Sequence, residues 1–498
     1  MTAVSVAEPT SSEPLADAPI PTARHFVKTI FRFGVAQALS WVSGAILVVI
    51  LPRFLGDVSY GKLGFGFALT TTYGLICDLG ISFFITKAVA RAPARAGEIL
   101  SNALAVRIAL SVVAALAVLA TLAILDYDST TEKVCLVLSV GMVMGGAANS
   151  LRGTLQGLHR MRTVAAAPVV SGFTYAGGSA AVLAVGVGVV GVAAVSVLAM
   201  ALATALNFTA LVRQVRWTLP SWRVSRYLIL GGLPFLVTQA ALVIYGQIDT
   251  LLLSLLTKDA VVGWYVAAVR IMSIPQFIPT ILTIVLFPAL SAAAARPESY
   301  NRILRGGVEV ILLVSVPIAF GIGLLPDRAI HLLGYPAAFD HSIVPLALLA
   351  LGTPLIALDM VIGYALLAGE QQKQWAAVGV AAAVLNIAMN LIAIPYAQHA
   401  FGNAAIAAAA TTTVTEMFIL ALGIKLLPRG ALDPQTYSYA ARCLTAAAAM
   451  ALVVTLLRDA PLVIPIALGG IVYGLASVAL GTLATADLRL ALRHLLDR

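Results

Sequence analysis

Apolar runs long enough to cross a bilayer follow one another along almost the whole chain, with little sequence left between them. A hydrocarbon core of ~30 Å needs about 20 apolar residues of helix. Only 11% of the 498 residues are charged and 60% are hydrophobic, whereas a typical soluble domain has ~25% charged residues. These features exclude a soluble globular fold and predict an all-α integral membrane protein.

We expect about 14 transmembrane helices, in two parallel six-helix bundles around a central cavity, with two further helices at the periphery. The expected spans are 33–51, 60–85, 103–125, 134–151, 164–186, 189–212, 227–255, 261–292, 308–333, 343–368, 375–396, 404–427, 439–457 and 461–484.

Four domains follow from these spans. Residues 1–23 are rich in Pro, Ser, Thr and Ala and lack the apolar core of a signal peptide, so we expect a disordered cytoplasmic tail. Residues 24–216 and 217–427 are the expected N-terminal and C-terminal six-helix bundles. Residues 428–498 are expected to form two extra helices and a short basic cytoplasmic tail.

Most of the 31 lysines and arginines fall on alternate loops if the N-terminus is cytoplasmic. Cytoplasmic loops of membrane proteins are enriched in these residues, so the alternation predicts an even number of spans with both termini cytoplasmic. The net charge of +9 then reflects topology, and no nucleic-acid partner is expected. Six basic residues lie on the expected outer side: Arg53, Lys62, Lys133, Lys258, Arg328 and Arg458.

A weak internal repeat supports the division into two halves. Residues 54–61 lead into the second expected span much as residues 256–263 lead into the eighth, and 155–158 resemble 367–370. Matching elements lie six spans apart and both copies start inside, so the halves are parallel repeats, an architecture typical of transporters. The three cysteines show no spacing typical of a disulfide framework or metal site, so no metal is expected.

Several short motifs carry a family resemblance. They are 51–61 (LPRFLGDVSYG), 77–81 (CDLGI), 247–249 (QID), 262–268 (VGWYVAA), 385–387 (LNI), 394–395 (IP) and 402–405 (GNAA). Together they resemble the Wzx-type polysaccharide flippases, in the superfamily that also holds the MATE drug exporters and the lipid II flippases.

The resemblance implies a transporter of the bacterial cytoplasmic membrane, with no cofactor and no enzymatic step. Its implied substrate is an undecaprenyl-diphosphate-linked oligosaccharide, which moves from the cytoplasmic to the outer leaflet. The implied partners are this lipid-linked oligosaccharide, membrane lipids and polysaccharide-assembly proteins.

Polar side chains inside the expected spans are the candidate substrate-binding or cavity residues, because an ionisable group at mid-bilayer costs ~2.5–3.5 kcal/mol on insertion scales. The candidates are Asp78, Arg107, Asp249, Arg270, Asp359, Asn386, Asn390 and Glu416.

Two interpretations are open for Asp249 and Arg270, which lie within about two helical turns of the same outer loop. They can form an ion pair that locks two spans together. Alternatively, Arg270 lies on a cavity wall, where its planar guanidinium suits the oxygens of a diphosphate. For Asp78, a helix-packing or loop-contact role is favoured over substrate contact.

Asp359 and Glu416 have no obvious basic partner in the sequence. Each can be protonated, hydrogen-bonded or exposed to a wet cavity, and a role in proton coupling is open. Asn386 and Asn390 lie one helical turn apart, which suits interhelical hydrogen bonding first and sugar contact second. Because a lipid-facing carboxylate has no partner, we expect Asp359, Glu416 and Asn386 to face the central cavity.

The first alternative function is a MATE-like, ion-coupled exporter of cationic molecules, which buried Asp249, Asp359 and Glu416 would suit. Buried acids outnumber buried bases, which disfavours the lipid II branch in particular. A diphosphate held at a basic cytoplasmic rim near Arg107 and Arg152 stays compatible with the pattern.

The second alternative is an integral-membrane glycosyltransferase or polymerase. Such enzymes usually place catalytic residues on sizeable outer loops. The outer loops expected here are short, and His331, His341 and His399 are their only histidines. The enzyme class is therefore disfavoured.

Overall fold

The structure is a computed structural model that describes residues 23–483, and every regular element in this range is a helix. The elements are α1 (Ala23–Asp78), α2 (Ile81–Arg91), η1 (Pro93–Arg95), α3 (Ala96–Leu125), α4 (Ser129–Gly157), α5 (Met161–Ala184), α6 (Gly188–Leu211), α7 (Trp222–Leu256), α8 (Asp259–Ser273), α9 (Phe277–Ala293), α10 (Pro297–Leu324), α11 (Pro326–Leu332), η2 (Ala337–Ser342), α12 (Ile343–Ala368), α13 (Gln372–Phe401), α14 (Ala405–Leu426), α15 (Pro434–Leu456) and α16 (Val463–Ala479). The all-α prediction is confirmed. The tail predicted for residues 1–23 lies outside the described residues except for Ala23, as does the end of the chain from residue 484.

Helix α1 holds the first two predicted spans. At Gly56 the backbone takes φ 72° and ψ 174°, which divides α1 into a first arm, 23–55, and a second arm, 57–78. A side chain disfavours this positive φ, and glycine avoids that penalty. The predicted continuation of the second span to residue 85 was wrong. Leu79 and Gly80 take φ values of 43° and 73°, and the separate helix α2 begins at Ile81.

Two other predicted spans are also broken. The run 261–292 forms α8 and α9, which are bent by 47° at a break that contains Pro275. The run 308–333 ends as a long helix at Leu324 and continues as the short helix α11. Proline lacks the backbone N–H and clashes with the preceding turn, so Pro275 disfavours a continuous helix at the first break.

The described residues contain 11 helices long and apolar enough to cross a membrane, or up to 12 if the bent α8–α9 pair is one span. The predicted count of 14 is therefore not confirmed by length and composition. Helix α1 enters this count once although it has two arms, and α16 is a shorter apolar helix of 17 residues.

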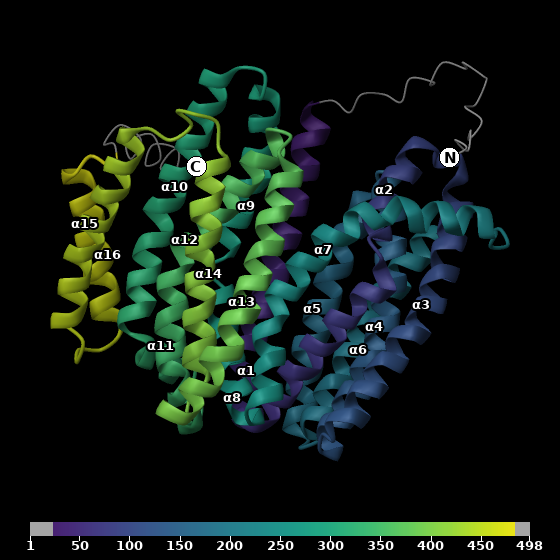
Figure 1. The fold of residues 1–498 in the computed structure, drawn as a ribbon, viewed down its shortest axis with the longest axis horizontal. Helices are drawn as coiled ribbons and strands as arrows, with labels where there is room; N and C mark the ends of the chain where they lie inside the picture. The colour runs from purple at the N-terminus through teal and green to yellow at the C-terminus, as the bar shows by residue number, and fades with distance from the viewer. Residues whose placement is uncertain (1–22, 484–498) are drawn as a thin grey trace.

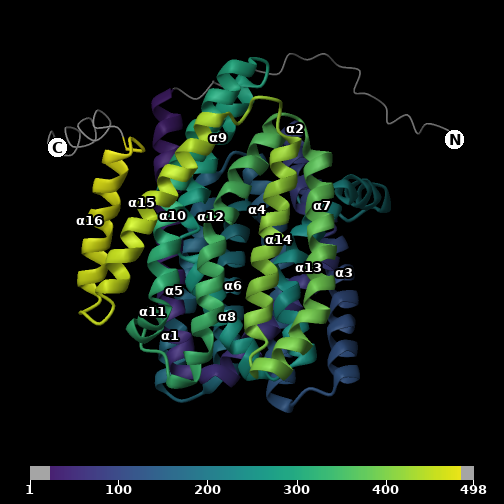
Figure 2. The same ribbon diagram turned by 60° about the vertical axis from the view of Figure 1, so that its left-hand side comes forward.

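The helices form two groups that lie side by side (Figure 1). We call α1–α6 the N-terminal half and α7–α14 the C-terminal half. Helix α7 begins against α2 and α3 and also packs against α13, so it runs between the halves. Helices α15 and α16 pack against each other and against α10 at one edge of the molecule (Figure 2).

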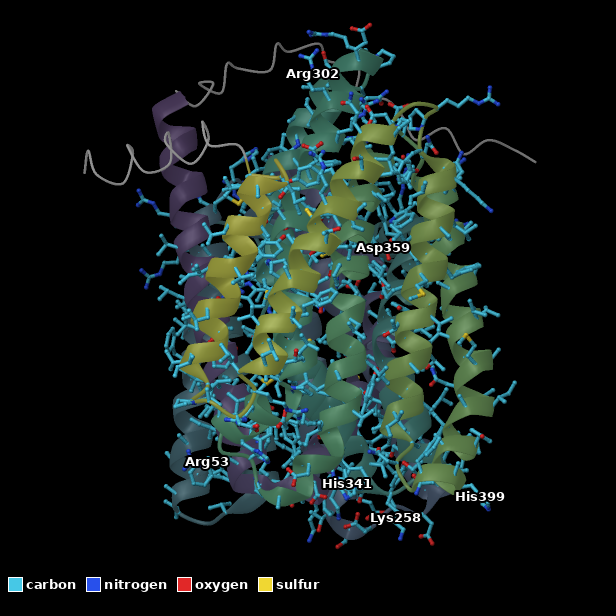
Figure 3. The ribbon with its side chains drawn as sticks, turned by 90° about the vertical axis from the view of Figure 1, so that its left-hand side faces the viewer. Arg53, Lys258, Arg302, His341, Asp359 and His399 are labelled. Atoms are coloured by element: carbon cyan, nitrogen blue, oxygen red, sulfur yellow. The ribbon has the colours of Figure 1, made fainter. Side chains whose placement is uncertain are left out.

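The two ends of the helix bundle carry different labelled residues (Figure 3). Arg302 lies at one end, whereas Arg53, Lys258 and His341 lie at the other, which we call the His341 end. Asp359 lies between the two ends. The charge alternation in the sequence places Arg302 on one side of the membrane and Arg53 and Lys258 on the other, and the structure separates them in the same way.

An apolar core joins the two halves near the His341 end. It includes Leu63 and Phe65 from α1, Val262 from α8 and Phe339 from η2, each at most 2% exposed. Because lipid tails are as apolar as these side chains, such contacts between membrane helices are stabilised by van der Waals packing. The halves are therefore held together at this end by packing as well as by polar contacts.

Candidate functional site

A buried ion pair lies in the N-terminal half. The Arg107 guanidinium on α3, 2% exposed, donates through Nη2 to Oδ1 of Asp78 and to Oγ of Ser82 at 2.7 Å. Asp78 ends α1 and Ser82 lies in the first turn of α2, so the turn at Leu79 and Gly80 brings both acceptors to Arg107. Nε and Nη1 of Arg107 have no hydrogen-bond partner among the described residues.

Two adjoining cavities lie beside the second arm of α1. The first, which we call the Arg270 cavity, has a volume of about 480 Å³ and is lined by α1, α5 and α8. Among the described residues, Arg270 is the only charged one in this lining. Its side chain is exposed and makes no ion pair with any of them. Trp41, Tyr60 and Tyr175 contribute aromatic surface to the same wall. An anion that entered this cavity would meet one unneutralised guanidinium.

The second cavity, which we call the Asn149 cavity, has a volume of about 450 Å³. It is enclosed by α1, α3, α4, α5, α6 and α7 and includes Asp78 and Arg107 in its wall. Phe67 and Tyr175 line both cavities, and their rings meet edge to face with centroids 6.3 Å apart. These two rings therefore form the boundary between the cavities.

A polar network without a cation lies inside the C-terminal half. Asp249 on α7, 6% exposed, accepts hydrogen bonds from Tyr265 at 2.6 Å, Thr412 at 2.6 Å and Asn390 at 2.7 Å. The Asn390 side chain also donates to the Asn386 side-chain and backbone oxygens, both at 3.0 Å. Helices α7, α8, α13 and α14 thus meet at a single carboxyl group whose partners are all neutral.

Two further carboxyl groups lie next to each other between α12 and α14. Glu416 accepts a hydrogen bond from the Tyr245 hydroxyl at 2.6 Å, and Asp359 is its neighbour. Both are buried, at 6% and 7% exposure, and neither oxygen of Asp359 has a hydrogen-bond partner among the described residues. Two carboxylates in one poorly solvated site repel each other, which favours retention of a proton by one of them.

The two halves meet at the His341 end through matching residues of the internal repeat. A Cβ atom added to Gly61 would lie 1.9 Å from the Asp259 carbonyl oxygen, and one added to Gly263 would lie 2.1 Å from the Asp57 carbonyl oxygen. Asp57 matches Asp259 in the repeat, and Gly61 matches Gly263. The contact is therefore reciprocal, and only glycine allows the backbones to approach so closely.

Side-chain contacts also lie at this end, beside the backbone contact between the halves. Trp264 donates to an Asp57 carboxylate oxygen at 3.0 Å and stacks on His341 with ring centroids 4.1 Å apart. Lys62 Nζ lies 3.8 Å from Asp259 Oδ2 across the two halves, and 2.6 Å from Asp128 Oδ2 within the N-terminal half. Burial opposes a low pKa for the Asp128 carboxyl, but hydrogen bonds from Lys62, Thr131 and the Thr130 amide lower it to about 2.

The predicted site residues fall into two groups, those that line one of the two cavities and those that line neither. Arg270 lines the first cavity, and Asp78 and Arg107 line the second. Five others are buried in the C-terminal half and line neither cavity: Asp249, Asp359, Asn386, Asn390 and Glu416. Asp359, Glu416 and Asn386 thus avoid lipid as expected, but they face packed neighbours and not either of these cavities.

Two expectations need correction. The Asp249–Arg270 ion pair does not form, because Asp249 faces α13 and α14 while Arg270 faces the cavity beside α1 and α5. Arg107 does not belong to a basic rim, because its guanidinium is buried and paired with Asp78. Asn386 and Asn390 do bond to each other, in keeping with the hydrogen-bonding interpretation.

Sequence reasoning missed the Asp78–Arg107 pair and the tyrosines that donate to the carboxylates. A signal for the pair was present, because each residue is an isolated charge within an apolar run and the two have opposite signs. No sequence signal singled out Tyr245 or Tyr265, since tyrosine is common in membrane helices.

Comparison with known proteins identifies the class. A profile of the family described as "polysaccharide biosynthesis protein" matches residues 26–294, more than half of the chain. The chain therefore belongs to this polysaccharide biosynthesis family, and the predicted resemblance is confirmed. No curated protein matches the sequence significantly.

Several solved structures have a similar fold. A lipid II flippase, MurJ in an inward closed conformation, superposes with a TM-score of 0.70 at 15% identity and covers 91% of this chain and 98% of its own. An inward-facing MATE multidrug transporter has a TM-score of 0.64 at 17% identity, with 80% and 97% covered. A transporter from Pyrococcus furiosus has a TM-score of 0.52 at 16% identity, with 80% and 95% covered. The protein is thus a multi-pass membrane protein with the fold shared by these transporters.

Proposed function

We propose that the protein flips a polyprenyl-diphosphate-linked oligosaccharide across the bacterial cytoplasmic membrane, with membrane lipids and polysaccharide-assembly proteins as its other partners. Family membership supports a role in polysaccharide biosynthesis, and the fold supports a transporter. We assign the protein no covalent chemistry. Transport then needs a site for the charged headgroup that is accessible from one leaflet at a time.

The observation that carries the proposal is the lone guanidinium of Arg270 in a cavity between α1, α5 and α8. A diphosphate is the strongest charge on such a substrate. The fork of donors on arginine matches its oxygens, and Arg270 has no carboxylate partner among the described residues to compete for them. The aromatic and aliphatic wall around it suits the first part of the prenyl chain.

The contacts at the His341 end support an alternating-access mechanism. We assign this end to the outer side of the membrane and the Arg302 end to the cytoplasm, in agreement with the positive-inside rule. Reciprocal packing at Gly61 and Gly263 then closes the outer side. Rocking of the halves would open this contact and expose the headgroup to the outer leaflet.

We further propose that the adjacent carboxyl groups of Asp359 and Glu416 take up and release a coupling proton. They are buried, they are next to each other, and no lysine, arginine or histidine pairs with them among the described residues. A change in their protonation would alter packing between α12, α14 and α7, because Tyr245 on α7 donates to Glu416.

Export of cationic molecules is the second candidate, favoured by these same carboxyl groups and by the MATE-like fold. A cationic substrate would need an unneutralised acid on a cavity wall. Within the part of the chain that the structure describes, Asp78 is the only acid that lines either cavity, and Arg107 neutralises it. The geometry therefore favours an anionic headgroup.

The test is a flipping assay in proteoliposomes that contain a fluorescent undecaprenyl-diphosphate oligosaccharide. A membrane-impermeant quencher reports how fast the label changes leaflet. We expect Arg270→Ala to slow flipping at least tenfold and Arg270→Lys to retain part of the rate, because lysine keeps the charge but loses the fork.

Arg302→Ala is the matched control, since Arg302 is an arginine remote from both cavities, and it should flip at the wild-type rate. A wild-type protein that leaves the diphosphate lipid in place but moves an organic cation would overturn the proposal in favour of an exporter.

A further inference from the structure

We propose that the Asn149 cavity is the subsite for the uncharged sugar that is joined directly to the diphosphate. The inference rests on the proposed flippase function and adds the class of glycan that the protein accepts. Its volume of about 450 Å³ falls within the ~300–1,000 Å³ typical of small-molecule pockets.

Unused hydrogen-bonding groups gather in this cavity. The side chains of Thr71, Asn149, Ser171 and Gln239 line it and have no hydrogen-bond partner among the described residues. The Tyr175 hydroxyl, also in the lining, is buried without a partner. Of these groups only the Tyr175 hydroxyl is buried, and a buried polar group without a partner costs ~1–3 kcal/mol. Thr71 and Asn149 are exposed, and Ser171 and Gln239 are partly buried, so all four can reach a polar ligand in the cavity.

The chemistry of these groups indicates sugar hydroxyl and acetamido groups. Amide side chains both donate and accept, and so do hydroxyl groups, which matches the mixed donors and acceptors of a sugar ring. Phe67, Met142 and Met200 add apolar surface for the C–H face of the ring.

The charges in the wall disfavour an acidic sugar. Of the residues in 23–483, Arg107 is the only cation that lines the Asn149 cavity, and Asp78, in the same wall, already neutralises it. A uronic acid would therefore find no free cation and would lie near the Asp78 carboxylate. Removal of its charge from water without a counter-ion is costly.

The position of the cavity fits the covalent structure of the substrate. The first sugar is bonded to the diphosphate, so its subsite must adjoin the site that holds the phosphates. Phe67 and Tyr175 line both cavities, so a ligand with its diphosphate at Arg270 can place its first sugar past these two rings.

The experiment measures binding of three short-chain prenyl diphosphate diesters to the full-length protein in detergent. One carries N-acetylglucosamine, one carries glucuronic acid, and the third is a methyl ester with the diphosphate charge but no sugar. We expect the N-acetylglucosamine probe to bind about tenfold more tightly than the methyl ester, as one or two net hydrogen bonds would give. The glucuronic acid probe should show no such gain.

Isosteric variants test which side chains give the preference for the N-acetylglucosamine probe. Asn149→Leu with Gln239→Met removes the hydrogen bonds and keeps the shape, so the tenfold preference for N-acetylglucosamine should disappear while methyl ester binding stays unchanged. Thr71→Ala should weaken the preference in part. Thr72→Ala is its matched control, because the Thr72 hydroxyl bonds the Ala68 carbonyl at 2.8 Å and lies outside the cavity. Unchanged methyl ester binding also shows that the variants fold.

The outcomes distinguish failure of the sugar subsite from failure of the proposed flippase function. If the methyl ester binds through Arg270 but the sugar adds nothing, or if the isosteric variant keeps the sugar preference, the subsite is wrong and the flippase function stands. If the glucuronic acid probe binds most tightly, the neutral class is wrong. If none of the three diphosphates binds, the proposed function and the subsite are both overturned.

Discussion

The two halves of the molecule bury their charged and polar side chains in different surroundings. In the N-terminal half, a buried guanidinium is matched by a carboxylate, Arg107 with Asp78, at the edge of a cavity. In the C-terminal half, three carboxyl groups are buried among tyrosine, threonine and asparagine, with no cation among the described residues. The first centre holds two opposite charges that offset each other, whereas the second holds carboxyl groups with only neutral partners among the described residues.

This difference suggests a division of labour between two halves that carry matching sequence segments. A neutralised pair beside a cavity does not compete with Arg270 for the diphosphate, and it leaves the neighbouring wall suited to uncharged groups. A carboxyl cluster away from the substrate cavities can respond to protons without direct contact with the sugar. The sugar subsite and the coupling groups would then lie in different halves, while Arg270 on α8 of the C-terminal half would hold the diphosphate where the two halves meet.

The largest effect is expected for Arg107→Ala. Removal of one member of a buried ion pair strands the other charge, which costs about 3–5 kcal/mol. The double variant Asp78→Asn with Arg107→Met should recover much of that loss, because no buried charge remains. Unfolding midpoints in detergent measure both. If the single and double variants lose equal stability, the pair is not what stabilises this turn.

Asp249→Ala should cost less, although Asp249 accepts three hydrogen bonds. Its donors are neutral, and Thr412 and Asn390 keep their bonds to the Ala408 carbonyl and to Asn386. We expect a loss of about 1–3 kcal/mol and a still smaller loss for Asp249→Asn, measured by the same unfolding assay. A loss as large as that of Arg107→Ala would mean that Asp249 has a charged partner outside the described residues.

The sequence predicted much of the fold because hydrophobic length and charge alternation are local signals. Both are present in each segment and do not depend on how the helices pack. The breaks at Leu79 and near Pro275 depend on single residues within long apolar runs, and such runs show no change of hydropathy at a bend. Helix existence was therefore predictable from the sequence, but helix continuity was not.

The site was harder to predict because partner choice depends on which face of each helix points inward. Asp249 and Arg270 are near in sequence, but they face different helices. Asp78 and Arg107 are further apart in sequence, and the turn at Gly80 brings them together. Long apolar helices of this kind are apolar all round, so the sequence does not mark the inward face.

The third prediction concerns the reciprocal contact between the halves at Gly61 and Gly263. Gly61→Ala and Gly263→Ala should each force the backbones apart, because the added Cβ atoms would overlap carbonyl oxygens. Overpacking of this kind typically costs 1–3 kcal/mol, so we expect about tenfold greater access to the Arg270 cavity from the His341 end. A cysteine at Ser273 reports this access in a background without Cys77, Cys135 and Cys443.

Gly246→Ala is the control for this pair, because no atom lies within 4 Å of the position of its Cβ. Equal effects of Gly61→Ala and Gly263→Ala would support a reciprocal contact. An effect at only one of the two positions would show that the repeat symmetry is not functional at this end.

The smallest effect is expected from the Lys62–Asp128 pair beside the same contact. The pKa of Asp128 is about 2, below its ordinary value of 3.8, so its ionised form stabilises the folded protein. That contribution is complete above about pH 4 and is lost only as the pH falls through 2.

The Asp128 side chain is 46% exposed, so solvent screening limits the contribution of the Lys62–Asp128 pair to about 1 kcal/mol or less. Asp128 positions Lys62, which also lies 3.8 Å from Asp259 across the contact. Asp128→Asn should therefore raise labelling of the Ser273→Cys reporter by at most about fivefold. A change from pH 8 to pH 5 should not raise labelling relative to that of the same thiol in unfolded protein at each pH, which corrects for loss of the reactive thiolate. If the contact opens between pH 8 and pH 5, and still does so in the Asp128→Asn variant, the expectation is wrong and pH control passes to Asp259, the other acid beside Lys62.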